Sequence, residues 1–195
     1  LRWGVFNVNE ALSELTGLPV RAGNDATVAA LGECWKGGGQ GCKNMIMATL
    51  GTGVGGGIVV NGQILLGAHG AAGEIGHIVL NREETEPCGC GKLGCAEQYC
   101  SATGVVRVTK RHLAATDAPS KLRQIEKLTC KDVFDCAKDG DEVAQQALEK
   151  VYAYLGEFLG NLCDVVDPDA GVLGGGVSRA GQVLRDGIRA SCDQY

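Results

Sequence analysis

The chain has 195 residues and a net charge of −5, with 45% hydrophobic and 21% charged residues. These proportions are typical of a soluble globular protein with one core, or with one domain and part of another. No stretch combines clustered Lys and Arg with aromatic residues, so nucleic acid is not expected as a main partner. No apolar run approaches the roughly 20 residues that a membrane-spanning helix needs.

The unusual features of the composition are its ten cysteines and 31 glycines. So many cysteines would suit a secreted, disulfide-bonded domain. The spacing argues against this class, because Cys88, Cys90 and Cys95 lie within eight residues and most of the others are scattered through helix-like or strand-like stretches. Scattered buried cysteines behave as small apolar side chains. We therefore expect a protein of the reducing cytoplasm.

The first predicted element is a short strand-like run over residues 18–23, which leads into Asn24-Asp25. A helix is expected over residues 26–35, and its buried stripe would consist of Val28, Ala29, Leu31 and Trp35. Residues 45–50 form a continuous apolar run, typical of a strand covered on both faces. After a glycine-rich run, Asn61-Gly62 between two apolar stretches predicts a tight hairpin turn.

The C-terminal half has mainly helical patterns from Ala96 onward. The clearest helix spans residues 141–166, with an acidic start, one apolar face and Pro168 beyond its end. A short strand over residues 171–173 precedes a second glycine turn and a final helix from about Arg179. Strands that alternate with helices in this way favour an α/β domain with a mixed sheet.

Four side chains able to bind a metal lie close together in the sequence: His77, Cys88, Cys90 and Cys95. One imidazole and three thiolates are a complete tetrahedral set for a structural zinc ion, with no open position for a reacting water. The glycines between the cysteines let the backbone turn tightly around an ion. The alternatives are loop cysteines without a role, or a local disulfide, for which Cys88 and Cys90 are too close to pair easily.

Two glutamates flank this cluster, Glu74 three residues before His77 and Glu97 two residues after Cys95. If one ring nitrogen of His77 binds the ion, the other is free to meet a ligand near both carboxylates. Such a set suits recognition of a polyol, because each group can hydrogen-bond a hydroxyl. Taken singly, Glu74 would be a solvated turn residue and Glu97 an acid in the first turn of a helix.

Asn24 and Asp25 are good helix N-caps, and taken alone they would be expected to have only that role. The functional alternative is that Asp25 accepts the proton of an attacking hydroxyl while Asn24 holds a neighbouring hydroxyl.

The glycine runs at residues 50–57 and 173–178 could be tight turns without a functional role, or they could bind a ligand. The first run is neither a Rossmann fingerprint nor a P-loop, since a strand follows it and it lacks the lysine. Its backbone N–H groups and the Thr52 hydroxyl could still wrap phosphates, and the second run could support a flat ring.

In this order the motifs resemble those of the ROK family (repressors, open reading frames and kinases) over essentially the whole chain. The matching runs are Gly23-Asn24-Asp25-Ala26, residues 50–57, Gly73-Glu74-Ile75-Gly76-His77 and residues 88–97. The resemblance implies an actin-like (ribonuclease-H-like) ATPase fold, in which two α/β lobes close on sugar and ATP. Most of this chain would be the larger C-terminal lobe, with a mixed sheet and flanking helices.

The resemblance also implies a role for each motif. Asp25 would be the catalytic base, and the sugar would be held by Asn24, Glu74, His77 and Glu97. Structural Zn²⁺ would be bound by His77, Cys88, Cys90 and Cys95. The phosphates of ATP, which enters with Mg²⁺, would face Gly51, Thr52 and Gly53. The adenosine would be lined by Gly174, Gly175 and Gly176.

Kinases of the family begin with an Asp-x-Gly-Gly-Thr loop that embraces phosphate and magnesium, and this sequence contains nothing like it. We therefore expect residues 1–28 to be the tail of an incomplete small lobe. Residues 29–195 would be the large lobe, with a zinc-binding loop at residues 77–95 and an incomplete C-terminal end. Such a piece is expected to be inactive alone, and the full-length protein to be a homo-oligomer, a dimer by analogy with the family.

The activity implied is ATP-dependent phosphorylation of a hexose, and the sequences around Glu74–His77 and Ser101-Ala102-Thr103-Gly104 favour glucose. Kinases for N-acetylmannosamine, fructose and allose share most of these motifs. The second hypothesis is a sugar-responsive repressor of the same family. Repressors keep the sugar and zinc residues, and many lose the ATP motifs, which are intact here. A third hypothesis is a zinc-stabilised structural module that binds no sugar.

Overall fold

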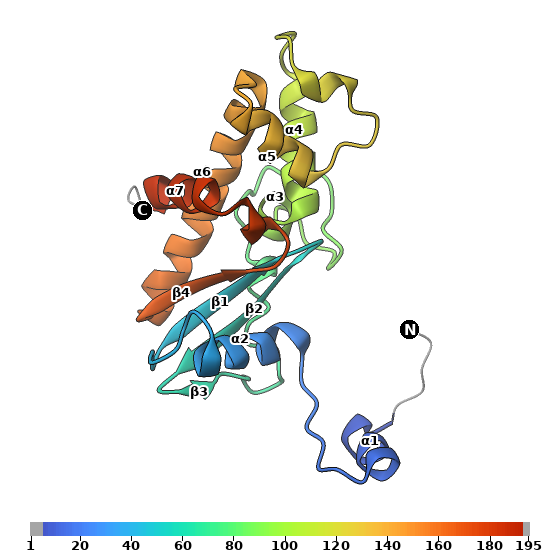
Figure 1. Cartoon of the computed structure of the whole chain (residues 1–195), viewed down its shortest axis with the longest axis vertical. Helices are drawn as coiled ribbons and strands as arrows, with labels where there is room; N and C mark the ends of the chain where they lie inside the picture. The colour runs from blue at the N-terminus through green and yellow to red at the C-terminus, as the bar shows by residue number, and fades with distance from the viewer. Residues whose placement is uncertain (1–5, 193–195) are drawn as a thin grey trace.

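The computed structural model describes residues 6–192, which form a mixed sheet with one helix on one face and a group of helices on the other (Figure 1). The strands are β1 (Met45–Leu50), β2 (Val54–Val60), β3 (Gln63–Ile64) and β4 (Ala170–Gly174), in the order β3-β2-β1-β4. β1 pairs antiparallel with β2 and parallel with β4. Because β1 and β4 are parallel neighbours, their carboxyl ends lie side by side, and a glycine turn follows each strand.

Alternate residues of β1 lie on opposite faces of the sheet. Met45 and Met47 pack with Ala30 of helix α2 (Asp25–Lys36) on one face. Ile46, Ala48 and Leu50 belong to the larger core on the other face. This confirms the prediction of a strand covered on both faces, and it explains why every second residue does not need to be polar.

The larger core is built by helices. These are α3 (Glu97–Cys100), α4 (Ala102–Ala114), α5 (Cys130–Lys138), α6 (Glu142–Val166) and α7 (Gln182–Cys192), with short 3-10 turns η1 (Ile75–His77), η2 (Lys121–Gln124) and η3 (Val177–Ala180). Asp141 caps α6 by accepting a hydrogen bond from the N–H of Ala144, and Asp167 ends it in a left-handed conformation. The predicted helix over residues 141–166 is therefore confirmed. None of the helices within residues 6–192 is long and apolar enough to cross a membrane.

The prediction of the buried face of α2 was wrong except at Ala29, which is partly buried against the core on this side of the sheet. Val28, Leu31 and Trp35 are exposed, whereas the small residues Ala26 and Ala30 are buried. The reason lies in β2, where a Cβ built on Gly57 would be 2.3 Å from the Cβ of Ala30. The helix lies so close to the strand that only its alanine stripe fits against the glycines.

The strand-like run over residues 18–23 is not a strand. It is an exposed, extended link between α1 (Val8–Thr16) and α2, and Figure 1 shows α1 standing apart from the sheet. Its backbone bonds side chains of α1 instead, Val20 N to Ser13 Oγ at 3.1 Å and Ala22 N to Asn9 Oδ1 at 2.6 Å. A strand needs a neighbouring strand to pair with its backbone groups, and within residues 6–192 no strand pairs with this run.

The turn that follows β1 is shorter than predicted. Only residues 51–53 form the turn, because Val54–Gly57 already belongs to β2. The hairpin after β2 is confirmed, since Asn61 and Gly62 have φ of 52° and 76°, the positive values that a tight turn of this kind requires.

Candidate functional site

The loop between η1 and α3 brings the four predicted metal ligands together. The ligand atoms of His77, Cys88, Cys90 and Cys95 all lie within 4.8 Å of one another. The sulfurs of Cys90 and Cys95 are 3.6 Å apart, and Cys88 Sγ is 3.8 Å from Nδ1 of His77. A tetrahedral ion that binds sulfur at about 2.3 Å holds two thiolates about 3.8 Å apart, so donor set and spacing both fit zinc. The three cysteines of the cluster form no disulfide.

Burial controls the ionisation of these thiols. It raises the pKa of Cys88, and it raises the pKa of Cys95 to about 12. The hydrogen bond from the backbone N–H of Lys92 lowers the pKa of the exposed Cys90. The three thiols therefore do not ionise together near neutral pH unless a positive charge compensates them. A divalent cation would supply that charge.

Glu97 connects this cluster to the first glycine turn. Its Oε2 accepts a hydrogen bond from the N–H of Val54 at 3.0 Å, and its Oε1 is 3.6 Å from Cys88 Sγ. A Cβ on Gly53 would lie 2.3 Å from the same Oε2, so the glycine leaves room for the carboxylate. Glu97 is thus more than an acid in the first turn of α3, because its side chain reaches across to β2.

The start of β2 is packed between two of the predicted sugar motifs. A Cβ on Gly55 would lie 2.9 Å from the Cβ of Ala26 at the start of α2. On the other face, a Cβ on Gly56 would lie 2.4 Å from the side chain of Ile75 in η1. The start of α2 and the Glu74–His77 turn therefore lie at the same point along one strand.

The side chains at these two places differ in how they are held. Asn24 caps α2 by accepting a hydrogen bond from the N–H of Thr27 at 3.1 Å, and Asp25 accepts from the N–H of Ala26 at 2.8 Å. Glu74 is exposed and makes no capping hydrogen bond to η1. Within the described part of the chain, no hydrogen bond joins Asn24 or Asp25 to Glu74 or Glu97. The predicted cap is confirmed for Asn24, whereas Asp25 is the first residue of α2 rather than its cap. Both Asp25 and Glu74 are exposed to solvent.

The two glycine turns meet at the shared edge of β1 and β4. Gly175 has φ of +84°, and a Cβ there would lie 2.5 Å from the carbonyl oxygen of Leu50. Beyond Gly176 a cleft of about 550 Å³ lies between α5 and η3, and basic side chains on its wall are Lys131, Lys138 and Arg179. Ligands of α/β sheets bind beyond the carboxyl ends of the strands. Asp135 also lines the cleft and forms an ion pair with Lys131, so an anionic ligand would be met mainly by Lys138 and Arg179.

The first glycine turn is tied to α4, a contact that the sequence did not indicate. The N–H of Ala102 donates to the carbonyl oxygen of Gly51 at 2.8 Å, and the hydroxyl of Thr103 donates to the backbone carbonyl oxygen of Thr52, also at 2.8 Å. The N–H of Gly51 is bonded within the turn to the carbonyl oxygen of Gly53. Of the predicted phosphate contacts, the backbone donor of Gly51 is therefore already used.

The sequence model of the ROK family matches residues 1–195. The chain belongs to the ROK family. A glucokinase of Halalkalibacterium halodurans is 45% identical over 99% of this chain and 59% of its own length. The structure of a ROK family glucokinase from Streptomyces griseus, in complex with glucose and AMPPNP, has a TM-score of 0.85 and 36% identity over 96% of this chain and 62% of that one.

A ROK family transcriptional regulator, a homologue of the Escherichia coli MLC protein, is also similar, with a TM-score of 0.84 and 31% identity over 96% of this chain and 47% of that one. The ROK chain described here spans about 60% of the length of the kinases that it matches. The predicted family and the predicted actin-like α/β fold with a mixed sheet are confirmed. The roles of individual residues and the division between residues 28 and 29 remain predictions.

Proposed function

We propose that the full-length protein is a glucokinase, which transfers the terminal phosphoryl group of ATP to glucose. The observation that carries the proposal is the position of Glu97, whose carboxylate touches both the Cys/His cluster and the strand that follows the first glycine turn. A sugar held at His77 and Glu97 would therefore lie beside the turn proposed to face the phosphates. The 45% identity to a glucokinase supports glucose as the sugar.

The side chains can be given roles that their contacts allow. Asp25 is the proposed base, because its carboxylate is exposed at the start of α2 and, among residues 6–192, only the neighbouring N–H of Ala26 is bonded to it. Asn24 uses its oxygen as the helix cap, which leaves its amide N–H groups to donate to a hydroxyl. His77 turns Nδ1 toward Cys88, which leaves Nε2 for the sugar. Glu74 accepts from a further hydroxyl.

Zn²⁺ is the proposed ion of the Cys/His cluster, and its role would be structural because all four positions are filled by protein. It would hold His77 and the loop before Glu97 in place. ATP supplies the phosphoryl group when it is bound along residues 51–53 and 174–176. Among residues 6–192, the Cys/His cluster is the one group of three or more side chains gathered closely enough for a metal ion, so Mg²⁺ would enter with the nucleotide.

A sugar-responsive regulator is the second candidate, because a regulator of the family matches the fold as well as a kinase does, with a TM-score of 0.84. Two features support the kinase. Both glycine turns are intact, and the cleft beyond the second one is lined by three basic side chains.

The test compares wild type with Asp25→Asn in the full-length gene product, by ADP release with glucose, N-acetylmannosamine or fructose as acceptor. The amide keeps the shape of the side chain but cannot take a proton, so kcat should fall by about 10²–10⁴-fold while glucose affinity changes little. Asp164→Asn, at an exposed position on α6, is the matched control and should leave kcat unchanged. A loss of less than about tenfold in Asp25→Asn would mean that Asp25 is only an acidic residue in the first turn of α2 and not the base. Glucose binding without ADP release in wild type would favour the regulator.

A further inference from the structure

The loop that carries the cysteines also contains a buried carboxylate, Glu84, whose side chain is 1% exposed. Arg111 of α4 holds it with two hydrogen bonds of 2.7 and 2.9 Å, and Arg107 lies 3.2 Å away. The hydroxyl of Tyr99 donates to it at 2.6 Å. The hydrogen bond from Arg111 holds the pKa of Glu84 well below its ordinary value, so this carboxylate is charged at neutral pH.

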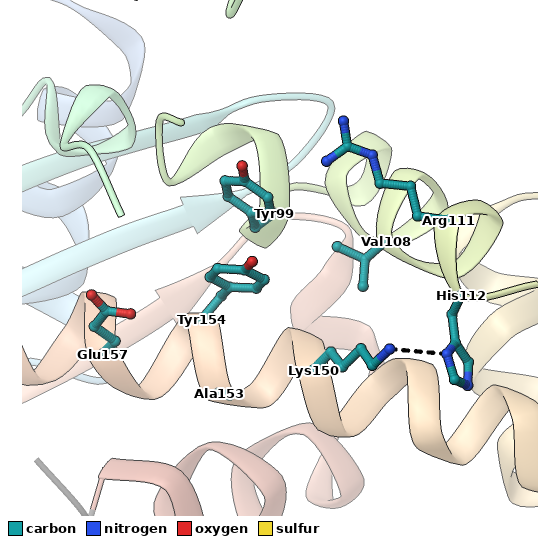
Figure 2. A pocket seen from close by; sticks show the side chains of 8 residues that line it. All are labelled: Tyr99, Val108, Arg111, His112, Lys150, Ala153, Tyr154 and Glu157. Carbon is teal, nitrogen blue, oxygen red and sulfur yellow. Dashed lines mark hydrogen bonds between the residues drawn. The ribbon is translucent and has the colours of Figure 1, made fainter. Parts of the chain in front are cut away.

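Glu84 fixes the turn that leads to the first cysteine. Its Oε1 accepts from the backbone N–H groups of Thr85 and Glu86, at 2.9 and 3.0 Å. Its partners Tyr99 and Arg111 come from α3 and α4, and Figure 2 shows both side chains directed away from α6. Tyr99 is itself held by stacking on Tyr154 of α6, with ring centroids 4.2 Å apart. The segment just before Cys88 is therefore anchored to the helical core.

Gln98 joins the two ends of the cysteine run. Its Oε1 accepts from the N–H groups of Gly94 and Cys95 at 2.9 and 3.1 Å, and its Nε2 donates to the carbonyl oxygen of Glu86 at 2.9 Å. The residue is buried. One side chain thus fixes the backbone of a ligand, Cys95, relative to the segment two residues before another ligand, Cys88.

We propose that Gln98 and Glu84 are positioning residues of the Cys/His cluster. They set the spacing of Cys88 and Cys95, and because Gln98 directly follows Glu97 in α3, the contacts of Gln98 also orient the sugar-binding carboxylate. Neither residue would touch the metal or the sugar. Groups that hold metal ligands in place commonly contribute about 10–100-fold to metal affinity, because they restrict the ligands to the binding geometry. The part of this proposal that concerns the sugar rests on the proposed function, whereas the part that concerns the metal does not.

Two substitutions of Gln98 separate its contacts. Gln98→Leu removes the acceptor and the donor, and leaves three backbone groups without their partner. Gln98→Glu keeps the acceptor for Gly94 and Cys95 but cannot donate to Glu86. The matched control is Val133→Ala, which opens a cavity in the core at α5, with no hydrogen bond to the loop, and lowers stability by a different route.

The experiment follows metal transfer from the Zn²⁺-loaded full-length protein to a chromogenic chelator, and the thiolate-to-metal charge-transfer absorption of the Co²⁺-loaded protein. Gln98→Leu should release metal about 10–100-fold faster and alter the Co²⁺ spectrum, with Gln98→Glu in between. Val133→Ala should keep the wild-type release rate and spectrum despite its lower melting temperature. If Gln98→Leu keeps wild-type release, if Val133→Ala releases metal as fast as Gln98→Leu, or if wild type takes up no metal, the proposal is wrong.

A glucose titration of the Zn²⁺-loaded proteins tests the sugar part. Gln98→Glu should bind glucose more weakly than wild type by about tenfold or more, since a misplaced Glu97 loses a hydrogen bond to the ligand. Equal affinities would overturn this part. A wild type that retains zinc but binds no glucose would refute the proposed function, and the effect of Gln98 on metal release would still stand.

Discussion

A single methyl group on β2 should displace the helix that carries the proposed base. Gly57 faces α2, and a Cβ at this position would lie 2.3 Å from the Cβ of Ala30 and 3.3 Å from the carbonyl oxygen of Ala26. Carbon atoms in contact are ordinarily at least about 3.5 Å apart. In Gly57→Ala the helix must therefore move away from the strand by roughly 1.2 Å, because neither alanine has a rotamer to change.

The expected cost has two parts. Overpacking of this kind typically lowers the free energy of unfolding by about 1–3 kcal/mol, which leaves a domain of ordinary stability almost fully folded. A displacement of about 1 Å at a catalytic group can lower the rate by about 10²-fold. Since α2 begins with Asp25, we expect kcat/KM of the full-length Gly57→Ala protein to fall by about 10²-fold, far more than its folded fraction.

The control is Gly32→Ala in the same helix, where an added Cβ has no neighbour within 4 Å. Alanine in an exposed helical position should stabilise the protein by about 0.8–1 kcal/mol and leave activity unchanged. Urea denaturation measures the stability of both variants, and coupled ADP release measures kcat/KM. Wild-type kcat/KM in Gly57→Ala would refute the argument, because it would mean that α2 does not carry the base or that the strand can yield instead.

Two further predictions concern the loop. Wild type should contain one zinc per chain by elemental analysis, and Cys95→Ser should lose the metal together with thermal stability, because the binding energy of a structural site is folding energy; reduced wild-type protein without zinc would refute this. The pKa of Glu84 is lower in the folded protein than the roughly 4.3 of an unfolded glutamate, so its stabilising contribution is complete at neutral pH and is lost as the pH falls below about 5. The free energy of unfolding of wild type should therefore drop between pH 5 and the onset of acid unfolding, and Glu84→Gln should flatten that slope; parallel slopes would contradict the assigned ion pair.

The sequence was sufficient where local patterns decide the outcome. The bounds of β1, the Asn61-Gly62 turn, the extent of α6 and the gathering of the Cys/His cluster all follow from neighbouring residues. The orientation of α2 does not, because large apolar residues predict a buried face only if the partner surface has room for them. Here the partner is a run of glycines, and the alanines fit better.

The contacts that support the site could not be predicted from the sequence, for a different reason. Arg111 reaches Glu84 across 27 positions in the sequence, and Gln98 reaches Glu86 across 12. Each of these residues has an ordinary solvated or helical role when it is considered alone. Lys131, Lys138 and Arg179 likewise come from two separate segments and meet only at the cleft beyond Gly176. Tertiary packing, rather than any local pattern, brings such groups together.

The close approach of α2 to β2 reverses the usual pattern of mutational tolerance. In most amphipathic helices the large apolar side chains are the ones that cannot be exchanged. Here, as far as the contacts of residues 6–192 go, Leu31 and Trp35 can vary in size, whereas one added carbon at Ala30 or Gly57 would displace α2 from the strand. A saturation library over residues 26–35 and 55–57 should therefore be depleted of variants at its smallest residues and permissive at its largest.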